Sequence, residues 1–265
     1  MIPTPALPPW IFYSLLLLLG LVLGSFFNVS DHRLPREESI VWPGSRCPRC
    51  GHPLGILDNL PLVSFLLLKG ACRYCRQAIS WRYPLIELSS GLLLALLGWR
   101  FGLSWALVQG ICLACLLLII SFIDLEHQII PDELSLPGLA LGLLLSGLIG
   151  HPGWKSSLIG LFLGGGVLYL LAAGYEKLTG REGMGGGDIK LLAMIGAFTG
   201  WPGVLVSLGV GALTGSLVGL VLMAFLKKER TFAVPFGPFL SLGALTHLLA
   251  GPRLIHWYLG LSTSL

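Results

Sequence analysis

The chain has 265 residues, of which 54% are hydrophobic and only 11% are charged, and its mean hydropathy is +0.83. One soluble core of this size could not hide so much apolar surface, which excludes an ordinary soluble domain and favours a polytopic membrane protein in a lipid bilayer. The net charge of +4 gives no reason to expect nucleic acid as a partner, because membrane insertion itself requires basic residues on one face.

The first apolar run, Trp10–Phe27, has no Lys or Arg before it. A cleavable signal peptide begins with a basic segment, so we expect residues 1–27 to hold a retained first transmembrane helix. Further apolar runs follow at 84–100, 103–123, 134–150, 156–175, 186–200, 203–226 and 235–259. The sequence therefore predicts an all-α polytopic membrane protein with about eight transmembrane helices.

The run 186–200 is the weakest of these predicted helices. It is short, it begins in glycines, and the sequence Trp201-Pro202-Gly203 ends it. A broken or re-entrant helix is therefore an alternative to a full crossing here.

Residues 28–83 form the one substantial polar segment and carry two C-x-x-C pairs, Cys47 with Cys50 and Cys72 with Cys75. Each pair can supply two thiolates to a tetrahedral ion, so the spacing predicts a small zinc-ribbon-like domain with a structural Zn²⁺. Two disulfides are the alternative, which a cytoplasmic location would disfavour. A third C-x-x-C pair, Cys112 and Cys115, lies within an apolar run, where we expect plain helix packing.

The basic residues indicate an orientation. Eight of the 17 Lys and Arg residues fall in 28–83, three in 176–190 and three in 227–230. The positive-inside rule therefore predicts that 28–83 is cytoplasmic and that both termini are periplasmic. On this topology Asp124 and Asp188 both emerge on the cytoplasmic side.

Asp124 and Asp188 are the strongest candidates for catalysis. Asp124 follows the apolar run ending at Ile123, and Asp188 follows three glycines, Gly185–Gly187. Ionisable groups at membrane depth usually have a function. Two neighbouring carboxyl groups can hydrolyse a peptide, because one can activate water while the other, kept protonated, donates to the carbonyl oxygen. Asp132 is a rival second carboxyl group, but we expect it to cap the helix that starts near Leu134.

A transporter that uses the two carboxyl groups as an ion pathway is the alternative from another functional class. Transporters are often built from matched repeats with broken helices, which the sequence does not show. A transport mechanism would also give no role to the cysteine pairs.

Several motifs then indicate a family. The chain carries, in order, Gly24-Ser-Phe-Phe-Asn28, Arg33-Leu-Pro35, Asp58-Asn-Leu-Pro61 between the cysteine pairs, Arg82-Tyr-Pro-Leu-Ile-Glu87, Ile130-Pro-Asp132, Gly183-Met-Gly-Gly-Gly-Asp188 and Pro235-Phe-Gly-Pro238. With these motifs the chain resembles the bacterial type IV prepilin leader peptidases, and its Gly185-x-Gly187-Asp188 resembles the G-x-G-D signature of intramembrane aspartyl proteases.

The resemblance implies an inner-membrane enzyme whose partners are prepilins or type II secretion pseudopilins. It implies cleavage of their leaders at the cytoplasmic face, followed by methylation of the new N-terminal amine from S-adenosylmethionine. It places the catalytic pair on Asp124 and Asp188 and the zinc ligands on Cys47, Cys50, Cys72 and Cys75. We expect 28–83 to form the tetracysteine domain and 84–265 the protease domain. The motifs identify no individual residues that bind the methyl donor, and we expect its site within 28–87. A membrane methyltransferase without protease activity is an alternative.

Overall fold

The computed structural model of the chain describes residues 8–180, 183–226 and 234–262. It divides into two compact units, Met1–Leu107 and Val108–Leu265. Helices are the only regular elements among the described residues, apart from two isolated β-bridges, which confirms the predicted all-α class. Arg181, Glu182, Lys227, Lys228 and Arg230 lie outside the described residues.

Six described helices are long and apolar enough to cross a membrane, so the predicted number of about eight is not confirmed. They are α1 (Pro9–Arg33), α3 (Arg82–Phe101), α4 (Trp105–His127), α5 (Asp132–Ile149), α6 (Trp154–Thr179) and α7 (Gly186–Leu226). A further helix, α8, spans Gly237–Ser262.

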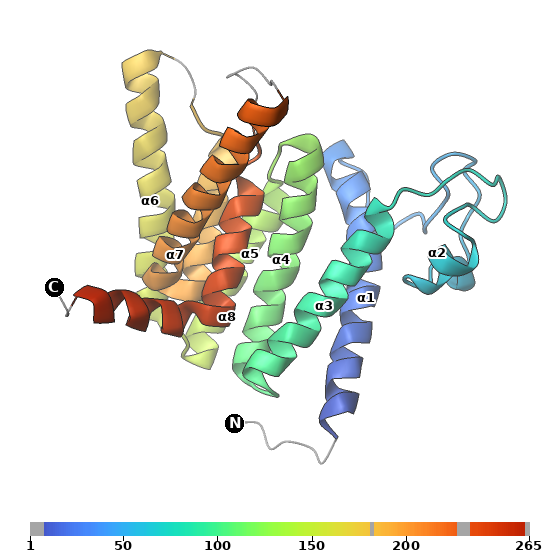
Figure 1. Ribbon diagram of the computed structural model, residues 1–265, viewed down its shortest axis with the longest axis horizontal. Helices are drawn as coiled ribbons and strands as arrows, with labels where there is room; N and C mark the ends of the chain where they lie inside the picture. Colours follow the sequence, from blue (N-terminus) through green and yellow to red (C-terminus); the bar gives the residue numbers. More distant parts are fainter. Residues whose placement is uncertain (1–7, 181–182, 227–233, 263–265) are drawn as a thin grey trace. The chain divides into compact units, whose positions relative to one another are not determined.

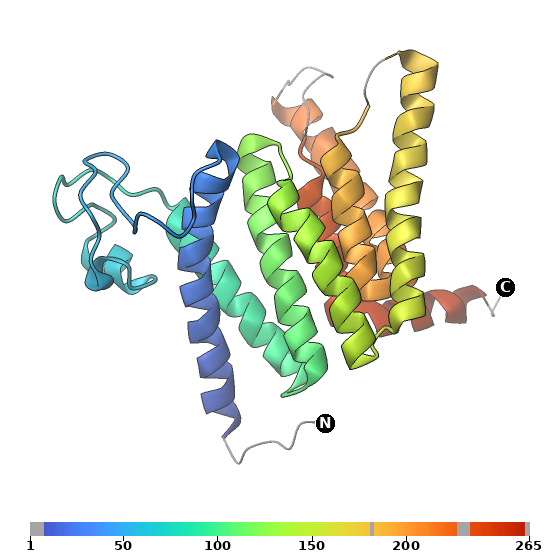
Figure 2. The same cartoon turned by 180° about the vertical axis from the view of Figure 1, so that it is seen from behind.

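In the first unit, α1 packs along α3 (Figures 1 and 2). The two backbones approach closely because a Cβ atom at Gly20 would lie only 2.5 Å from the carbonyl oxygen of Ser90. Small residues at such contacts let helices pack tightly in lipid. Helix α1 runs beyond the predicted end at Phe27, and Asp31 in its last turns forms an ion pair with Arg82 at 3.0 Å.

The cysteine-rich segment connects α1 to α3 and lies at one end of this helix pair (Figures 1 and 2). It contains two 3-10 turns, Leu34–Arg36 and Ile56–Asp58, and the short helix α2, Val63–Leu67. Glu87 of α3 ties it to the helices, since its Oε2 accepts a 2.8 Å hydrogen bond from the backbone N–H of Leu62.

The second unit is built around α7, which packs against α5, α6 and α8. Helices α6 and α7 meet at Gly160 and Gly196, whose side-chain-free backbones leave no room for a Cβ atom. The core of this unit is apolar and includes Leu117, Ile120 and Leu192.

Helix α7 breaks at Gly200, whose φ of 71° and ψ of −176° are not helical. Residues 186–199 and 201–226 form two limbs that run in opposite directions, and both ends of α7 lie at the same end of the unit (Figures 1 and 2). The predicted runs 186–200 and 203–226 are therefore these two limbs. A glycine suits the turn because φ in this range is costly for other residues.

The break leaves backbone carbonyl groups without helical partners, and side chains of α4 and α5 satisfy two of them. In a continuous helix the N–H of residue 202 would donate to the carbonyl oxygen of Phe198, but Pro202 has no N–H. Gln109 Nε2 donates to this oxygen instead, at 2.9 Å. Ser146 donates to the carbonyl oxygen of Ala197 at 3.0 Å. All of these groups are buried. Side chains far from the turn in the sequence therefore stabilise it.

Candidate functional site

Asp124 lies near the C-terminal end of α4 and is 5% exposed. Its Oδ2 accepts a 3.0 Å hydrogen bond from the backbone N–H of Gly237, the first residue of α8. A Cβ atom at position 237 would lie 2.6 Å from this oxygen, so only glycine lets the backbone approach the carboxyl group in this way. The glycine of the Pro235-Phe-Gly-Pro238 motif therefore fixes the position of Asp124.

Asp188 lies in the first turn of α7, beside the residues that surround Asp124. Ile130, in the connection between α4 and α5, contacts both Gly187 and Gly237: Cβ atoms at these glycines would lie 2.8 and 3.3 Å from its side chain. The structure thus brings together two aspartates that are 64 positions apart in the sequence.

Asp132 has a different role from the one predicted. Helix α5 begins at Asp132 itself, its N-cap is Pro131, and no side chain makes a capping hydrogen bond. Asp132 instead receives two hydrogen bonds from Lys190 Nζ, at 2.6 and 2.7 Å. The prediction of a cap was wrong because Asp132 lies one position inside the helix, where its carboxylate pairs with Lys190.

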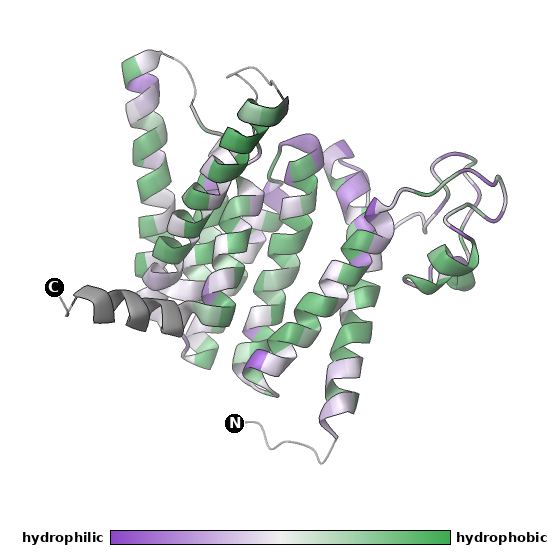
Figure 3. Ribbon diagram, in the orientation of Figure 1, coloured by the Kyte–Doolittle hydropathy of each residue, from purple (hydrophilic) through white to green (hydrophobic). Residues whose placement is uncertain are grey.

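Neither Asp124 nor Asp188 has a cationic partner within ion-pair distance in the part of the chain that the structure describes. Figure 3 shows hydrophilic residues gathered where α4 ends and α5 begins, beyond the apolar body of the helices. Two carboxyl groups at such a boundary, without a counter-ion, have the arrangement expected of an acid and base pair. Their catalytic roles stay a prediction.

The four predicted zinc ligands come together in the first unit. The Sγ atoms of Cys47, Cys50, Cys72 and Cys75 lie within 4.8 Å of one another, and Cys47 and Cys75 are 3.9 Å apart. Zn–S bonds of about 2.3 Å place the sulfurs of a tetrahedral site about 3.8 Å apart. The group therefore fits a zinc ion. All six cysteines of the chain are free thiols, which disfavours the disulfide alternative.

The two cysteine pairs sit in matching turns. The backbone N–H of Cys47 donates to the carbonyl of His52, and that of Cys72 to the carbonyl of Gln77, each five residues later. The bridges Arg46–Pro53 and Ala71–Ala78 close the two turns in the same register. Two equivalent turns present two thiols each toward one point, as a four-thiolate site requires.

The local electrostatics favour a thiolate at Cys47 and disfavour one at Cys75, whose pKa the neighbouring thiols help to raise to about 11. The backbone N–H of Cys50 donates to the Cys47 sulfur and is the main cause that lowers the pKa of this thiol to about 7. Arg73 donates to Asp58 at 2.7 Å, which lowers the pKa of that carboxyl group. Thiolates are the form that binds metal.

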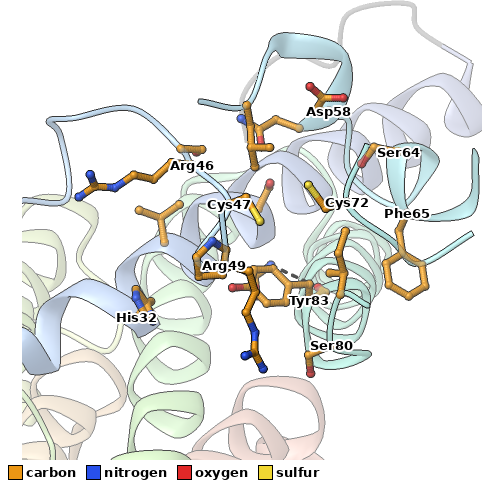
Figure 4. A pocket seen from close by; sticks show the side chains of 18 of the residues that line it. His32, Arg46, Cys47, Arg49, Asp58, Ser64, Phe65, Cys72, Ser80 and Tyr83 are labelled. Carbon is orange, nitrogen blue, oxygen red and sulfur yellow. Dashed lines mark hydrogen bonds between the residues drawn. The ribbon is translucent and has the colours of Figure 1, made fainter. Parts of the chain in front are cut away.

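A cavity of about 720 Å³ lies within the first unit (Figure 4). The ends of α1 and α3 form one side of it, with Asn28, Tyr83 and Glu87, and the cysteine-rich segment forms the other. Cys47 and Cys72 are part of its wall, so the cysteine cluster borders the cavity. No sequence pattern indicates this cavity, because its lining comes from segments up to 62 positions apart.

Two family models match the chain. The bacterial peptidase A24 N-terminal domain matches residues 18–101, and the type IV leader peptidase family matches residues 111–220. The first match holds the cysteine cluster and the cavity, and the second holds Asp124 and Asp188.

Several proteins named prepilin leader peptidase/N-methyltransferase are similar to the chain over most of its length. The protein of Aeromonas salmonicida is 37% identical over 276 residues, and that of Stutzerimonas stutzeri is 37% identical over 274 residues; each alignment covers 95% of both chains. The protein of Neisseria gonorrhoeae is 36% identical over 268 residues, which cover 91% of this chain and 92% of the relative. No solved structure matches significantly.

Proposed function

The chain belongs to the type IV leader peptidase family, and from this premise we propose that it cleaves the leader from prepilins or pseudopilins and then methylates the new N-terminal amine. The enzyme is a protease and a methyltransferase in one chain. Its proposed substrates are proteins with a basic leader followed by an apolar helix.

The juxtaposition of the buried Asp124 and the half-buried Asp188 is the observation that carries the protease assignment. The Gly237 N–H stabilises negative charge on Asp124, so this carboxylate takes a proton from water. The resulting hydroxide adds to the scissile carbonyl carbon, while Asp188 gives its proton to the carbonyl oxygen. When the intermediate collapses, the C–N bond breaks and the amine leaves with the proton from Asp124. Asp188 takes back a proton from a hydroxyl group of the intermediate, which restores the starting pair.

Methyl transfer needs an amine that exists only after cleavage, so cleavage comes first. S-adenosylmethionine supplies a methyl group on a sulfonium sulfur; the amine nitrogen bonds to its carbon, the C–S electron pair stays on sulfur, and the nitrogen loses a proton to water. The tetracysteine segment would hold one structural Zn²⁺ through Cys47, Cys50, Cys72 and Cys75, a closed site with no position open for substrate.

The distribution of basic residues supports an orientation in the bacterial inner membrane. Residues 28–83 then face the cytoplasm, both termini are periplasmic, and the protease site within 84–265 opens to the cytoplasmic side. A prepilin has its cleavage site at this boundary, between a basic leader in water and an apolar helix in lipid.

The test uses purified protein in lipid nanodiscs with a prepilin and S-adenosylmethionine, and it measures the mass of the product's N-terminus. The wild type should give a cleaved and methylated product. Asp124→Asn and Asp188→Asn should each reduce cleavage by at least about a thousandfold, because either change removes one partner of the proton exchange.

Asp132→Asn is the matched control, because Asp132 is exposed and paired with Lys190. It should cleave at a rate near that of the wild type. Substantial cleavage by a folded Asp124 or Asp188 variant would exclude the pair, and loss of cleavage only with Asp132→Asn and Asp124→Asn would assign the second carboxyl group to Asp132.

A further inference from the structure

The methyltransferase half of the proposed function needs a site for the methyl donor, and this inference rests on it. We propose that the cavity of the first unit binds S-adenosylmethionine, with the Glu87 carboxylate facing its sulfonium group. The cavity volume of about 720 Å³ lies within the range of small-molecule sites, roughly 300 to 1,000 Å³.

Glu87 has the properties of a receptor for a cation. It is 8% exposed, it lines the cavity, and its Oε2 accepts a hydrogen bond from the Leu62 N–H. Within the described residues it has no Lys, Arg or His at ion-pair distance. A buried carboxylate without a cation is costly, and a sulfonium ion would offset that cost.

The rest of the lining fits the other parts of the donor. Phe65 and Tyr83 supply rings on which an adenine base can stack, and Phe65 is held by a ring contact with Trp81 at 4.9 Å. Arg46 and Arg49 also line the cavity, and no acidic partner is assigned to them among the described residues. They can bind the donor's carboxylate.

The orientation follows from where the methyl acceptor must arrive. Glu87 lies in α3 and contacts Ser25 of α1, and both helices are candidate membrane spans. The new amine of a cleaved pilin is at the end of an apolar helix in the bilayer, so it approaches the cavity from its membrane side. The sulfonium methyl group must face that side, where Glu87 is.

The basic leader of the substrate is the competing occupant. It fits less well, because the lining holds more arginines (Arg33, Arg46, Arg49 and Arg73) than acidic residues (Glu38, Asp58 and Glu87), and the arginines repel a chain of lysines and arginines. Two of these are already engaged: Arg33 with the carbonyl groups of Ser39 and Gly44, and Arg73 with Asp58.

The test measures equilibrium binding to the full chain in nanodiscs, without prepilin. The ligands are S-adenosylmethionine, sinefungin, which has an ammonium group near the sulfonium position, and S-adenosylhomocysteine, which has a neutral sulfur there. Glu87→Gln should weaken binding of the two cationic ligands at least about tenfold and leave S-adenosylhomocysteine within about twofold. Glutamine still accepts from the Leu62 N–H, so the fold is preserved.

Glu37→Gln is the matched control, since Glu37 is exposed and does not line the cavity; it should change none of the three affinities. A second variant, Ala78→Phe, fills the cavity and should weaken all three ligands.

Three outcomes would overturn the proposal or its premise. If Glu87→Gln and Ala78→Phe bind all three ligands like a wild type that methylates pilin, the donor site is elsewhere. If Glu87→Gln instead raises only the KM for prepilin cleavage, the cavity holds the leader. If the wild type neither binds the donor nor methylates cleaved pilin, the proposed methyltransferase function itself fails.

Discussion

At the scale of single residues, the contact between Gly237 and Asp124 matters most for the proposed chemistry. A buried carboxyl group keeps a productive position only if its rotamer is fixed, and the Gly237 N–H fixes Asp124 from a different helix. The 2.6 Å approach leaves no room for a side chain at position 237.

We therefore expect Gly237→Ala to reduce prepilin cleavage about a hundredfold. The new methyl group would displace the Asp124 carboxyl group, and a displacement of about 1 Å in an active site can cost about a hundredfold in rate. The measurement is kcat for cleavage, together with thermal unfolding to confirm the fold. Gly209→Ala is the control, since a Cβ atom at Gly209 would meet nothing within 4 Å. Wild-type cleavage by Gly237→Ala would contradict the positioning role.

At the scale of elements, the two cysteine turns explain how a short segment with few apolar residues can fold. A structural metal ion replaces the core that such a segment lacks. The equivalent hydrogen bonds of Cys47 and Cys72 orient both thiol pairs without help from the helices.

Protein purified without chelators should contain about one zinc per chain, and Cys47→Ser or Cys72→Ser should lose it. Zinc binds thiolates, so affinity should rise with pH through the Cys47 pKa of about 7, and acidification should release the ion. Metal analysis after dialysis at a series of pH values measures both effects. Cys112→Ala should keep the metal, because Cys112 packs within α4; zinc-free wild-type protein would exclude the site.

The break in α7 is the second feature at this scale. Gln109→Leu removes the donor to the Phe198 carbonyl and should lower the free energy of unfolding by about 1 to 2 kcal/mol. The loss is limited because the buried Oε1 of Gln109, which has no partner among the described residues, is removed as well. Thermal unfolding in mild detergent measures it.

Thr214→Val serves as the comparison for Gln109→Leu, because Thr214 bonds only to carbonyl groups of its own helix. It should leave stability nearly unchanged. An equal effect of both substitutions would mean that Gln109 does not support the turn at Gly200.

At the scale of the whole molecule, the two proposed activities fall into different compact units. The cavity and the cysteine cluster lie in residues 1–107, and both aspartates lie in residues 108–265. Each family model also matches within one of these units.

The activities should therefore be separable. Asp188→Asn, given a pilin that has already been cleaved, should methylate it at a rate near that of the wild type. Glu87→Gln should cleave prepilin and accumulate unmethylated product. The mass of the N-terminus distinguishes these species, and failure of both folded aspartate variants to methylate cleaved pilin would mean that the sites overlap.

The sequence by itself determined the class of the molecule and most of its chemical groups. Apolar run lengths predicted the helices, and the spacing of Cys47, Cys50, Cys72 and Cys75 predicted a cluster that the structure confirms. Such features are local, because helix length and C-x-x-C spacing are set by neighbouring residues. The sequence Trp201-Pro202 also predicted an interruption between the two limbs of α7, although the non-helical residue is Gly200.

Only the tertiary structure decided which distant residues meet. Gly237 donates to Asp124 across 113 positions, and Gln109 donates to Phe198 across 89. Lys190 pairs with Asp132, which was expected to cap a helix. The cavity beside Glu87 arises in the same way, from α1, α3 and the segment between them. Spacing in the sequence cannot predict such contacts, because they depend on how whole helices pack and not on the preferences of neighbouring residues.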